Sequence, residues 1–229
     1  MADRLFETGD GREGGVPADA APLAVRMRPR TLDDLVGQRH LLAPGSALRT
    51  AIESGEPHSM VLYGPPGTGK TTIARIVATA ADGAFEEESA VNAGRAEVRA
   101  MLERAEERMR SGRRTVFFLD EIHRFNKAQQ DALLPAVEEG LITMIGATTE
   151  NPFFEVNSAL LSRAQIYELR PLGDEAVAEL LDRALVLGAD PFATLRGAWH
   201  RNFGRWRQIC RARLRLWLAR AIPCIACCA

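Results

Sequence analysis

Residues 63–72 read Tyr-Gly-Pro-Pro-Gly-Thr-Gly-Lys-Thr-Thr, in which two glycines with four residues between them precede a lysine and a threonine. This is the G-x-x-x-x-G-K-[ST] spacing of a loop that cradles phosphate groups. The glycines let backbone N–H groups turn toward phosphate oxygens, at dihedral angles that a Cβ would obstruct. The lysine would meet the β- and γ-phosphates, and the first threonine would bind Mg²⁺. We therefore predict that the following residues bind a nucleotide: Gly64, Pro65, Pro66, Gly67, Thr68, Gly69, Lys70, Thr71 and Thr72.

Two carboxylates, Asp120 and Glu121, follow an apolar run fifty residues after Lys70. The run at residues 115–119 is β-branched and aromatic without alternation, as in a central parallel strand. A carboxylate at the end of such a strand lies beside the phosphate loop, so Asp120 is predicted to hold Mg²⁺. Glu121 is predicted to orient and deprotonate the attacking water. Taken alone the pair is a weak signal, because strand ends often carry acids.

Polar residues also follow the next apolar run, at residues 141–146. A hydroxyl or amide here could sense the γ-phosphate and position the water. Thr149 is the preferred residue, with Thr148 and Asn151 as competitors. Further along, Arg163 ends a predicted short helix, and it either stabilises that helix end or enters a neighbouring subunit's site as an arginine finger. Spacing alone leaves these two roles open.

The elements that must position these residues alternate between strand and helix. The spacing of apolar residues predicts an α/β fold, with a parallel sheet covered by helices on both faces. A disordered arm is expected at residues 1–21, the nucleotide-binding domain at 22–170, the start of a helical lid at 171–187, and a tail of different composition at 188–229. Strands are predicted at the run up to 63 and at 84–91, 116–119, 141–146 and 167–169, and helices at 47–54, 71–81, 95–110, 126–138, 157–163 and 174–187.

Composition favours a cytoplasmic protein. The 229 residues contain no apolar run of 18, and the acidic N-terminus is not typical of a signal peptide. The formal net charge of −1 conceals an asymmetry, because eight arginines and no acidic residue lie from Thr194 onward. The preceding part is therefore acidic, and any DNA contact must come from a local patch or an assembly. Its lack of cysteine excludes structural disulfides and cysteine-based metal sites there.

Several short motifs of the sequence together resemble those of one protein family. They are Arg-Pro and Val-Gly-Gln at residues 28–38, GPPGTGKTT, DEIHRFNKAQQDALL, GATTENP and NSALLSR. The resemblance is to the clamp-loader group of AAA+ ATPases, and within it to the family of replication-associated recombination protein A. It extends over residues 22–185. Clamp loaders proper and the branch-migration motor match the segments at residues 123–127 and 149–152 less well.

The resemblance implies an ATPase that uses ATP and Mg²⁺ and acts with DNA at stalled forks or single-strand gaps. It also implies a homo-oligomer, a nucleoid-associated location in the cytoplasm, no membrane, and partners such as single-strand binding protein. Arg163 becomes the arginine finger. Other implied roles are adenine binding by Arg28, Val36, Gly37 and Gln38, restraint of Glu121 by Asn92, and coupling to DNA by Arg124 and Lys127.

After about residue 185 the chain departs from the family's pattern. The second sensing arginine and the oligomerisation region are not recognisable, and all four cysteines and three tryptophans lie in the last 31 residues. A reading-frame shift near residues 186–190 is the favoured explanation, and a genuine cationic or cysteine-rich tail is the alternative. A chain without these parts is expected to bind nucleotide weakly and hydrolyse little. The alternative functions are thus a fragment that binds nucleotide without hydrolysis, or a clamp-loader or branch-migration subunit.

Overall fold

The computed structural model of the protein describes residues 23–186, which belong to two compact units. The larger unit is Pro29–Leu180 and contains the whole sheet. The other unit includes residues 23–28, with helix α1 (Leu23–Arg26), and residues 181–186, the end of helix α10 (Asp174–Val186). The predicted arm at 1–21 and the tail at 188–229 lie outside the described residues.

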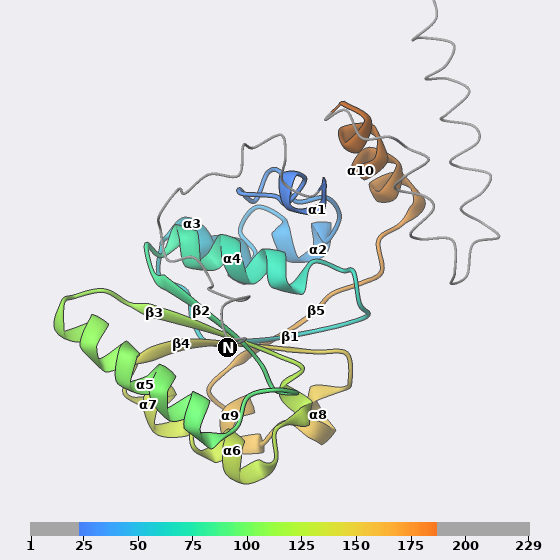
Figure 1. Ribbon diagram of the computed structural model, residues 1–229. Coiled ribbons are helices and arrows are strands. Elements are labelled where there is room, and N and C mark those ends of the chain that lie inside the picture. Colours follow the sequence, from blue (N-terminus) through green and yellow to red (C-terminus); the bar gives the residue numbers. More distant parts are fainter. Residues whose placement is uncertain (1–22, 187–229) are drawn as a thin grey trace, which may run out of the picture. The chain divides into compact units, whose positions relative to one another are not determined.

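Five strands form one sheet in the order β2-β3-β4-β1-β5, and every neighbouring pair is parallel (Figure 1). This confirms the predicted α/β class. All five strands are within a few residues of their predicted positions. They are β1 (Met60–Tyr63), β2 (Ala84–Ser89), β3 (Thr115–Asp120), β4 (Ile142–Thr148) and β5 (Gln165–Glu168).

Helices cover both faces of this sheet, so its central strands are buried on both sides. Side chains of β3 alternate between two cores, with Val116 and Phe118 on one face and Phe117 and Leu119 on the other. Helices α3 and α4 pack over the first face, and α5, α7 and α9 over the second (Figure 1). The helices of this unit before α10 are α2 (Arg39–Leu42), α3 (Ala47–Glu53), α4 (Lys70–Ala80), α5 (Arg95–Arg110), α6 (Lys127–Asp131), α7 (Leu134–Glu138), α8 (Pro152–Glu155) and α9 (Ser158–Leu161), with a 3₁₀ turn η2 (Ile122–Arg124).

The single helix predicted over residues 126–138 is wrong, because the structure has two short helices there, α6 and α7. Pro135 stands in the first turn of α7. Proline has no N–H to donate, and its ring would clash with the carbonyl of the residue four positions earlier. The chain therefore ends one helix at Asp131 and begins another at Leu134.

Helix α8 was not predicted, although its first residues carry a start signal. Asn151 accepts a hydrogen bond from the backbone N–H of Phe153 through its side chain, and Pro152 follows it at the first helical position. The helix is only four residues long, which is too short for a periodic apolar pattern to reveal it. Among the helices of the described residues, none has the length and apolar character needed to cross a membrane.

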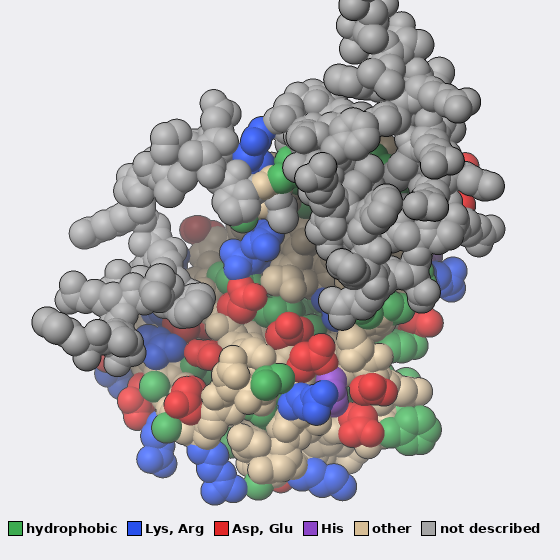
Figure 2. All heavy atoms as spheres, turned by 45° about the vertical axis from the view of Figure 1, so that its right-hand side comes forward, with side chains coloured by type: hydrophobic (Ala, Val, Ile, Leu, Met, Phe, Trp, Pro, Cys, Tyr) green, Lys and Arg blue, Asp and Glu red, His purple; other side chains and the backbone are tan. Residues whose placement is uncertain are grey.

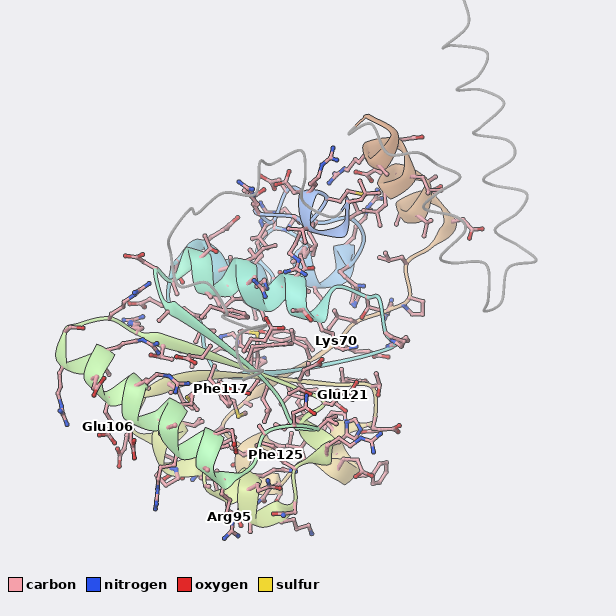
Figure 3. All side chains as sticks on the ribbon, viewed as in Figure 1. Lys70, Arg95, Glu106, Phe117, Glu121 and Phe125 are labelled. Carbon is pink, nitrogen blue, oxygen red and sulfur yellow. The ribbon has the colours of Figure 1, made fainter. Side chains whose placement is uncertain are left out.

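Replacing Phe117 by alanine tests the core on the α5 side of the sheet. Phe117 is fully buried (labelled in Figure 3), so Phe117→Ala should lower the free energy of unfolding by about 3–5 kcal/mol. Phe154 on α8 is 82% exposed, and Phe154→Ala is the control, expected to change stability by less than about 0.5 kcal/mol. Urea unfolding followed by circular dichroism measures both. Equal losses in the two variants would contradict this core.

Candidate active site

The predicted phosphate loop connects β1 to α4, as its sequence requires. Its first glycine, Gly64, has φ +152°, and its N–H donates to the Thr148 carbonyl at 3.1 Å. A Cβ at this position would lie 2.3 Å from the backbone oxygen of Leu169, which follows β5. Because a backbone carbonyl cannot move aside easily, only glycine fits where the chain leaves the sheet.

The later glycines of the loop face open space instead. Gly67 and Gly69 have φ of +79° and +99°, and a Cβ built on either would meet no atom within 4 Å. Gly69 is also the N-cap of α4, whose first backbone N–H groups have no partner within the helix. Glycine conformation, an open cradle and a helix N-terminus are the features of an anion site, so the loop fits the triphosphate that its sequence predicts.

Lys70 is buried at the start of α4, and its ammonium group is held by the loop itself. Its Nζ donates hydrogen bonds to the carbonyl oxygens of Gly64 at 2.8 Å and Pro65 at 3.1 Å. Burial lowers the pKa of Lys70, while the negative charges of Asp120 and Glu121 oppose that shift. The cation therefore binds the loop and also interacts electrostatically with Asp120 and Glu121. Figure 3 shows Lys70 and Glu121 at the same end of the sheet.

Gln38 ties the phosphate loop to the segment that follows β5. Its side-chain amide donates to the carbonyls of Arg170 at 2.7 Å and Thr68 at 3.3 Å, and its carbonyl oxygen accepts from the Arg170 N–H at 3.0 Å. Gln38 is buried and has φ +50°. Neighbouring Gly37 has φ +85°, and a Cβ there would lie 2.5 Å from the Leu172 side chain. Sequence reasoning did not reveal this clasp.

The adenine-binding role implied for residues 28–38 stays a prediction. Val36 and Gln38 are buried in the same unit as the loop, and Gly37 lies between them. Arg28 belongs to the other compact unit. The contacts of Gln38 show that this stretch at least positions the loop.

Asp120 and Glu121 stand where β3 ends. Asp120 is the last residue of the strand, and its carboxylate accepts a hydrogen bond from the Glu121 N–H at 3.1 Å. Glu121 has φ +54° and ψ +43°, a left-handed conformation that costs a non-glycine residue about 1–3 kcal/mol. This conformation ends strand β3 and begins the turn η2.

At the end of β4 the three candidate sensor residues have different environments. Thr148 is fully buried, and its hydroxyl accepts from the Glu150 N–H at 3.0 Å. The side chain of Asn151 caps α8. Thr149 is exposed at the same edge of the sheet as the phosphate loop, since Thr148 pairs with Tyr63 in the parallel register. These environments favour Thr149, which stays a prediction.

The structure also reveals a residue that sequence reasoning passed over, His123 on η2. Its Nδ1 lies 3.2 Å from Oε2 of Glu121 and 2.9 Å from the hydroxyl of Thr148. Asn92, the residue that the family resemblance suggested as the partner of Glu121, is exposed beyond the end of β2. The sequence carried a signal for this contact, because His123 follows the predicted base Glu121 by only two residues.

Arg163 lies at the opposite edge of the sheet from the phosphate loop. It precedes β5, whose first residue Gln165 pairs with Met60 at the start of β1. The guanidinium contacts a carboxylate oxygen of Glu138 at 2.6 Å and donates to the Ala159 carbonyl at 2.9 Å. A cleft of about 440 Å³ beside it is lined by residues 58–59 and 162–166. The structure therefore does not bring Arg163 to the other predicted site residues of its own chain.

The candidate metal ligands Thr71 and Asp120 are half-buried residues on neighbouring elements, α4 and β3. Among residues 23–186 no group of three His, Cys, Asp or Glu side chains is placed to hold a metal ion. Mg²⁺ commonly takes only one or two protein oxygens and completes its shell with waters and substrate phosphates. A threonine and one carboxylate beside the phosphate loop fit that pattern.

Comparison with known proteins agrees with this geometry. Residues 60–172 match the ATPase family associated with various cellular activities (AAA). The chain is 56% identical over 164 residues to Replication-associated recombination protein A of Escherichia coli K12, covering 72% of this chain and 37% of that protein. The protein of the same name from Coxiella burnetii is 53% identical over 167 residues, which cover 73% of this chain and 38% of that protein.

Among solved structures, the fold is similar to that of the Holliday junction branch migration motor RuvB of Thermotoga maritima. The TM-score is 0.57 at 33% identity, over 70% of this chain and 54% of that one. The chain therefore spans less than two-fifths of the length of the two relatives compared above.

Replacing Gln38 tests whether its clasp stabilises the loop. Gln38→Ala leaves the buried polar groups of Thr68 and Arg170 without their partner, so we expect a loss of about 1–3 kcal/mol in the free energy of unfolding. Gln165 is exposed at the start of β5, and Gln165→Ala is the matched control. Urea unfolding compares the two. A Gln38 variant as stable as the control would show that the clasp contributes little.

Proposed function

We propose that the chain is an ATPase of the AAA family, whose model matches residues 60–172, and that its loop, Asp120 and Glu121 together hydrolyse ATP with Mg²⁺. The observation that carries this is the buried Lys70, whose Nζ donates to the phosphate loop and whose charge interacts with the two carboxylates at the end of β3. A structural ion pair would not need an open, glycine-lined cradle beside it. Phosphoryl transfer needs both the charged side chains and the open loop, because its catalysis consists mainly of positioning and charge stabilisation.

Each residue has one task in the proposed reaction. Lys70 exchanges its bonds to the Gly64 and Pro65 carbonyls for the oxygens of the β- and γ-phosphates. Thr71 and Asp120 would hold Mg²⁺, and the ion would supply positive charge to offset the charge that develops on the phosphates. Glu121 accepts a proton from the attacking water. Thr149 orients that water and senses the γ-phosphate from the end of β4.

We also propose that hydrolysis is coupled to DNA. The family resemblance and the names of the relatives, which refer to replication and recombination, support this role. Arg124 and Lys127 are exposed after the Mg²⁺ strand, where bound DNA could act on the site. On the face shown in Figure 2 the coloured Lys and Arg side chains are interspersed with Asp and Glu. DNA binding is therefore proposed for an assembly of several chains rather than for one basic surface.

Arg163 is proposed to complete the site of a second copy of the chain. Strand β1 rises about 3.3 Å per residue, so its two ends are about 10 Å apart. Arg163 lies beyond the start of β1, whereas the phosphate loop follows its end. Arg163 would have to leave Glu138 and enter a neighbouring chain's site, which makes the active unit a homo-oligomer. Single-strand binding protein as a partner rests on the family resemblance alone.

A second candidate is a fragment that binds nucleotide without hydrolysing it. It is supported by the position of Arg163, which lies at the edge of the sheet opposite to the phosphate loop of its own chain. Nucleotide binding needs only the loop of one chain, whereas the proposed hydrolysis needs Arg163 of another. The two candidates therefore differ in turnover rather than in affinity.

Glu121→Gln separates the two candidates, because glutamine keeps the shape of the side chain but cannot take up a proton. If the chain is an ATPase, steady-state phosphate release should fall by about 10²–10⁴-fold while ATP affinity is retained. Phosphate release and equilibrium ATP binding, each with and without single-stranded or gapped DNA, make the measurement. Equal turnover of the variant and the unaltered chain would exclude Glu121 as the base, and no turnover in either would favour the fragment.

Mixing two inactive variants tests whether Arg163 acts between chains. Arg163→Ala has an intact loop but no finger, and Lys70→Ala has a finger but a defective loop. Each alone should lose ATPase activity, and an equimolar mixture should regain part of it, because the finger of one serves the loop of the other. Arg170→Ala is the control for removing an exposed arginine near β5. If the mixture stays as inactive as its components, Arg163 does not act in trans.

A further inference from the structure

The turn η2 brings the proposed catalytic base into contact with the buried end of β4 through His123. The Nδ1 of His123 lies within 3.2 Å of a carboxylate oxygen of Glu121 and within 2.9 Å of the Thr148 hydroxyl. The His123 side chain is only 11% exposed and that of Glu121 32%. Three side chains from two strand ends therefore share one partly enclosed network.

The hydrogen-bond capacities of these groups define which arrangements of the hydrogen are possible. An ionised carboxylate only accepts, so its contact with Nδ1 is a hydrogen bond only if Nδ1 carries a hydrogen. The Thr148 oxygen already accepts from the Glu150 N–H at 3.0 Å, and its own hydrogen can point to the Glu150 carbonyl at 3.4 Å. Two tautomers fit these distances. In one, Nδ1–H donates to Thr148 and faces Glu121, and in the other the Thr148 hydroxyl donates to Nδ1. The first is the one that lets His123 hold the carboxylate.

The turn that carries His123 is seated on β4 by a close contact. A Cβ added to Gly146 would lie 3.0 Å from Cδ1 of Ile122, the fully buried first residue of η2. Gly146 is thus the position on β4 that lets the turn lie directly against the strand. Two residues later the same strand presents the Thr148 hydroxyl to His123.

We propose that His123 is a positioning residue, which holds the Glu121 carboxylate in place and couples it to the sensor end of β4 through Thr148. This proposal rests on the proposed ATP hydrolysis with Glu121 as the base. Thr149 follows Thr148 directly, so a shift of the chain at the sensor reaches Glu121 through two contacts. His123 takes the part that the family resemblance suggested for Asn92, which is exposed.

The first test does not depend on turnover. Long-range ¹H–¹⁵N correlation spectra of the imidazole rings at pH 8 report which ring nitrogen carries hydrogen. The chain has four histidines, and comparison with His123→Asn identifies the signals of His123. We expect hydrogen on Nδ1 and a changed Nδ1 shift in Glu121→Gln and in Thr148→Val. A ring whose Nδ1 carries no hydrogen would overturn the proposal.

The second test separates positioning from binding. His123→Ala should lower the rate constant of hydrolysis by about 10²-fold, because the base is no longer held, and should leave the ATP dissociation constant within about twofold. His123→Asn places an amide N–H near the position of Nδ1 and should restore most of the rate. Asn92→Ala is the competing variant and should have little effect. The opposite pattern, with loss in Asn92→Ala and none in His123→Ala, would overturn the proposal.

The contact between Gly146 of β4 and Ile122 of η2 provides a third test. Gly146→Ala pushes Ile122 away from β4 and should reduce hydrolysis and alter the His123 signals, while Gly173→Ala, where a Cβ meets no atom within 4 Å, should do neither. Unchanged His123 signals in folded Gly146→Ala would count against the coupling. If Glu121→Gln hydrolyses ATP normally, the proposed function fails, whereas the position of the Nδ1 hydrogen still tests the contact itself.

Discussion

The parallel register of three neighbouring strands is the constraint on which the site depends. Strand β4 lies between β1 and β3, with Thr148 opposite Tyr63 and Gly146 opposite Leu119. The carboxyl ends of all three therefore meet at one edge. With strands about 4.8 Å apart, the chain that leaves β1 and the last residue of β3 are separated by about 10 Å across β4. Lys70 and Asp120 reach into this space from its two sides.

Two close approaches of the backbone explain why glycine occurs where it does in this edge. Gly64 passes the Leu169 carbonyl at a distance that a Cβ would reduce to 2.3 Å, and Gly146 lets Ile122 pack against β4. The first approach turns the chain from β1 into the phosphate loop. The second brings η2, and with it His123, against β4. Both glycines determine the positions of other residues of the site.

The sequence predicted the parts of the structure that local patterns encode. The five strands could be predicted from short apolar runs. The loop Gly64–Thr71 could be predicted from the spacing of its glycines, lysine and threonine, which is typical of phosphate binding. The break before α7 was missed, although Pro135 is a local signal against a continuous helix. The clasp of Gln38 could not be predicted, because it joins residues 132 positions apart and no pattern within either segment requires the other.

The role of His123 could be predicted only in part, because one of its two contacts is local in sequence and the other is not. Its contact with Glu121 is local, but its contact with Thr148 depends on the pairing of β3 with β4, which sequence spacing alone does not fix. The same dependence explains why Thr148, Thr149 and Asn151 could not be distinguished from sequence. Burial distinguishes Thr148 from the two exposed residues, and the capping of α8 distinguishes Asn151 from Thr149. Both depend on how the chain packs at the end of β4.

The position of Arg163 is the reason for proposing that two chains share the chemistry. Every other proposed catalytic residue lies at the carboxyl edge of the sheet, whereas Arg163 precedes β5 at the opposite edge and contacts Glu138 there. A single chain can therefore offer its loop to a nucleotide but cannot bring its own Arg163 to the γ-phosphate without taking β5 out of the sheet. Under the proposed function, one chain binds the nucleotide and Arg163 of a second chain completes the charge around the transition state.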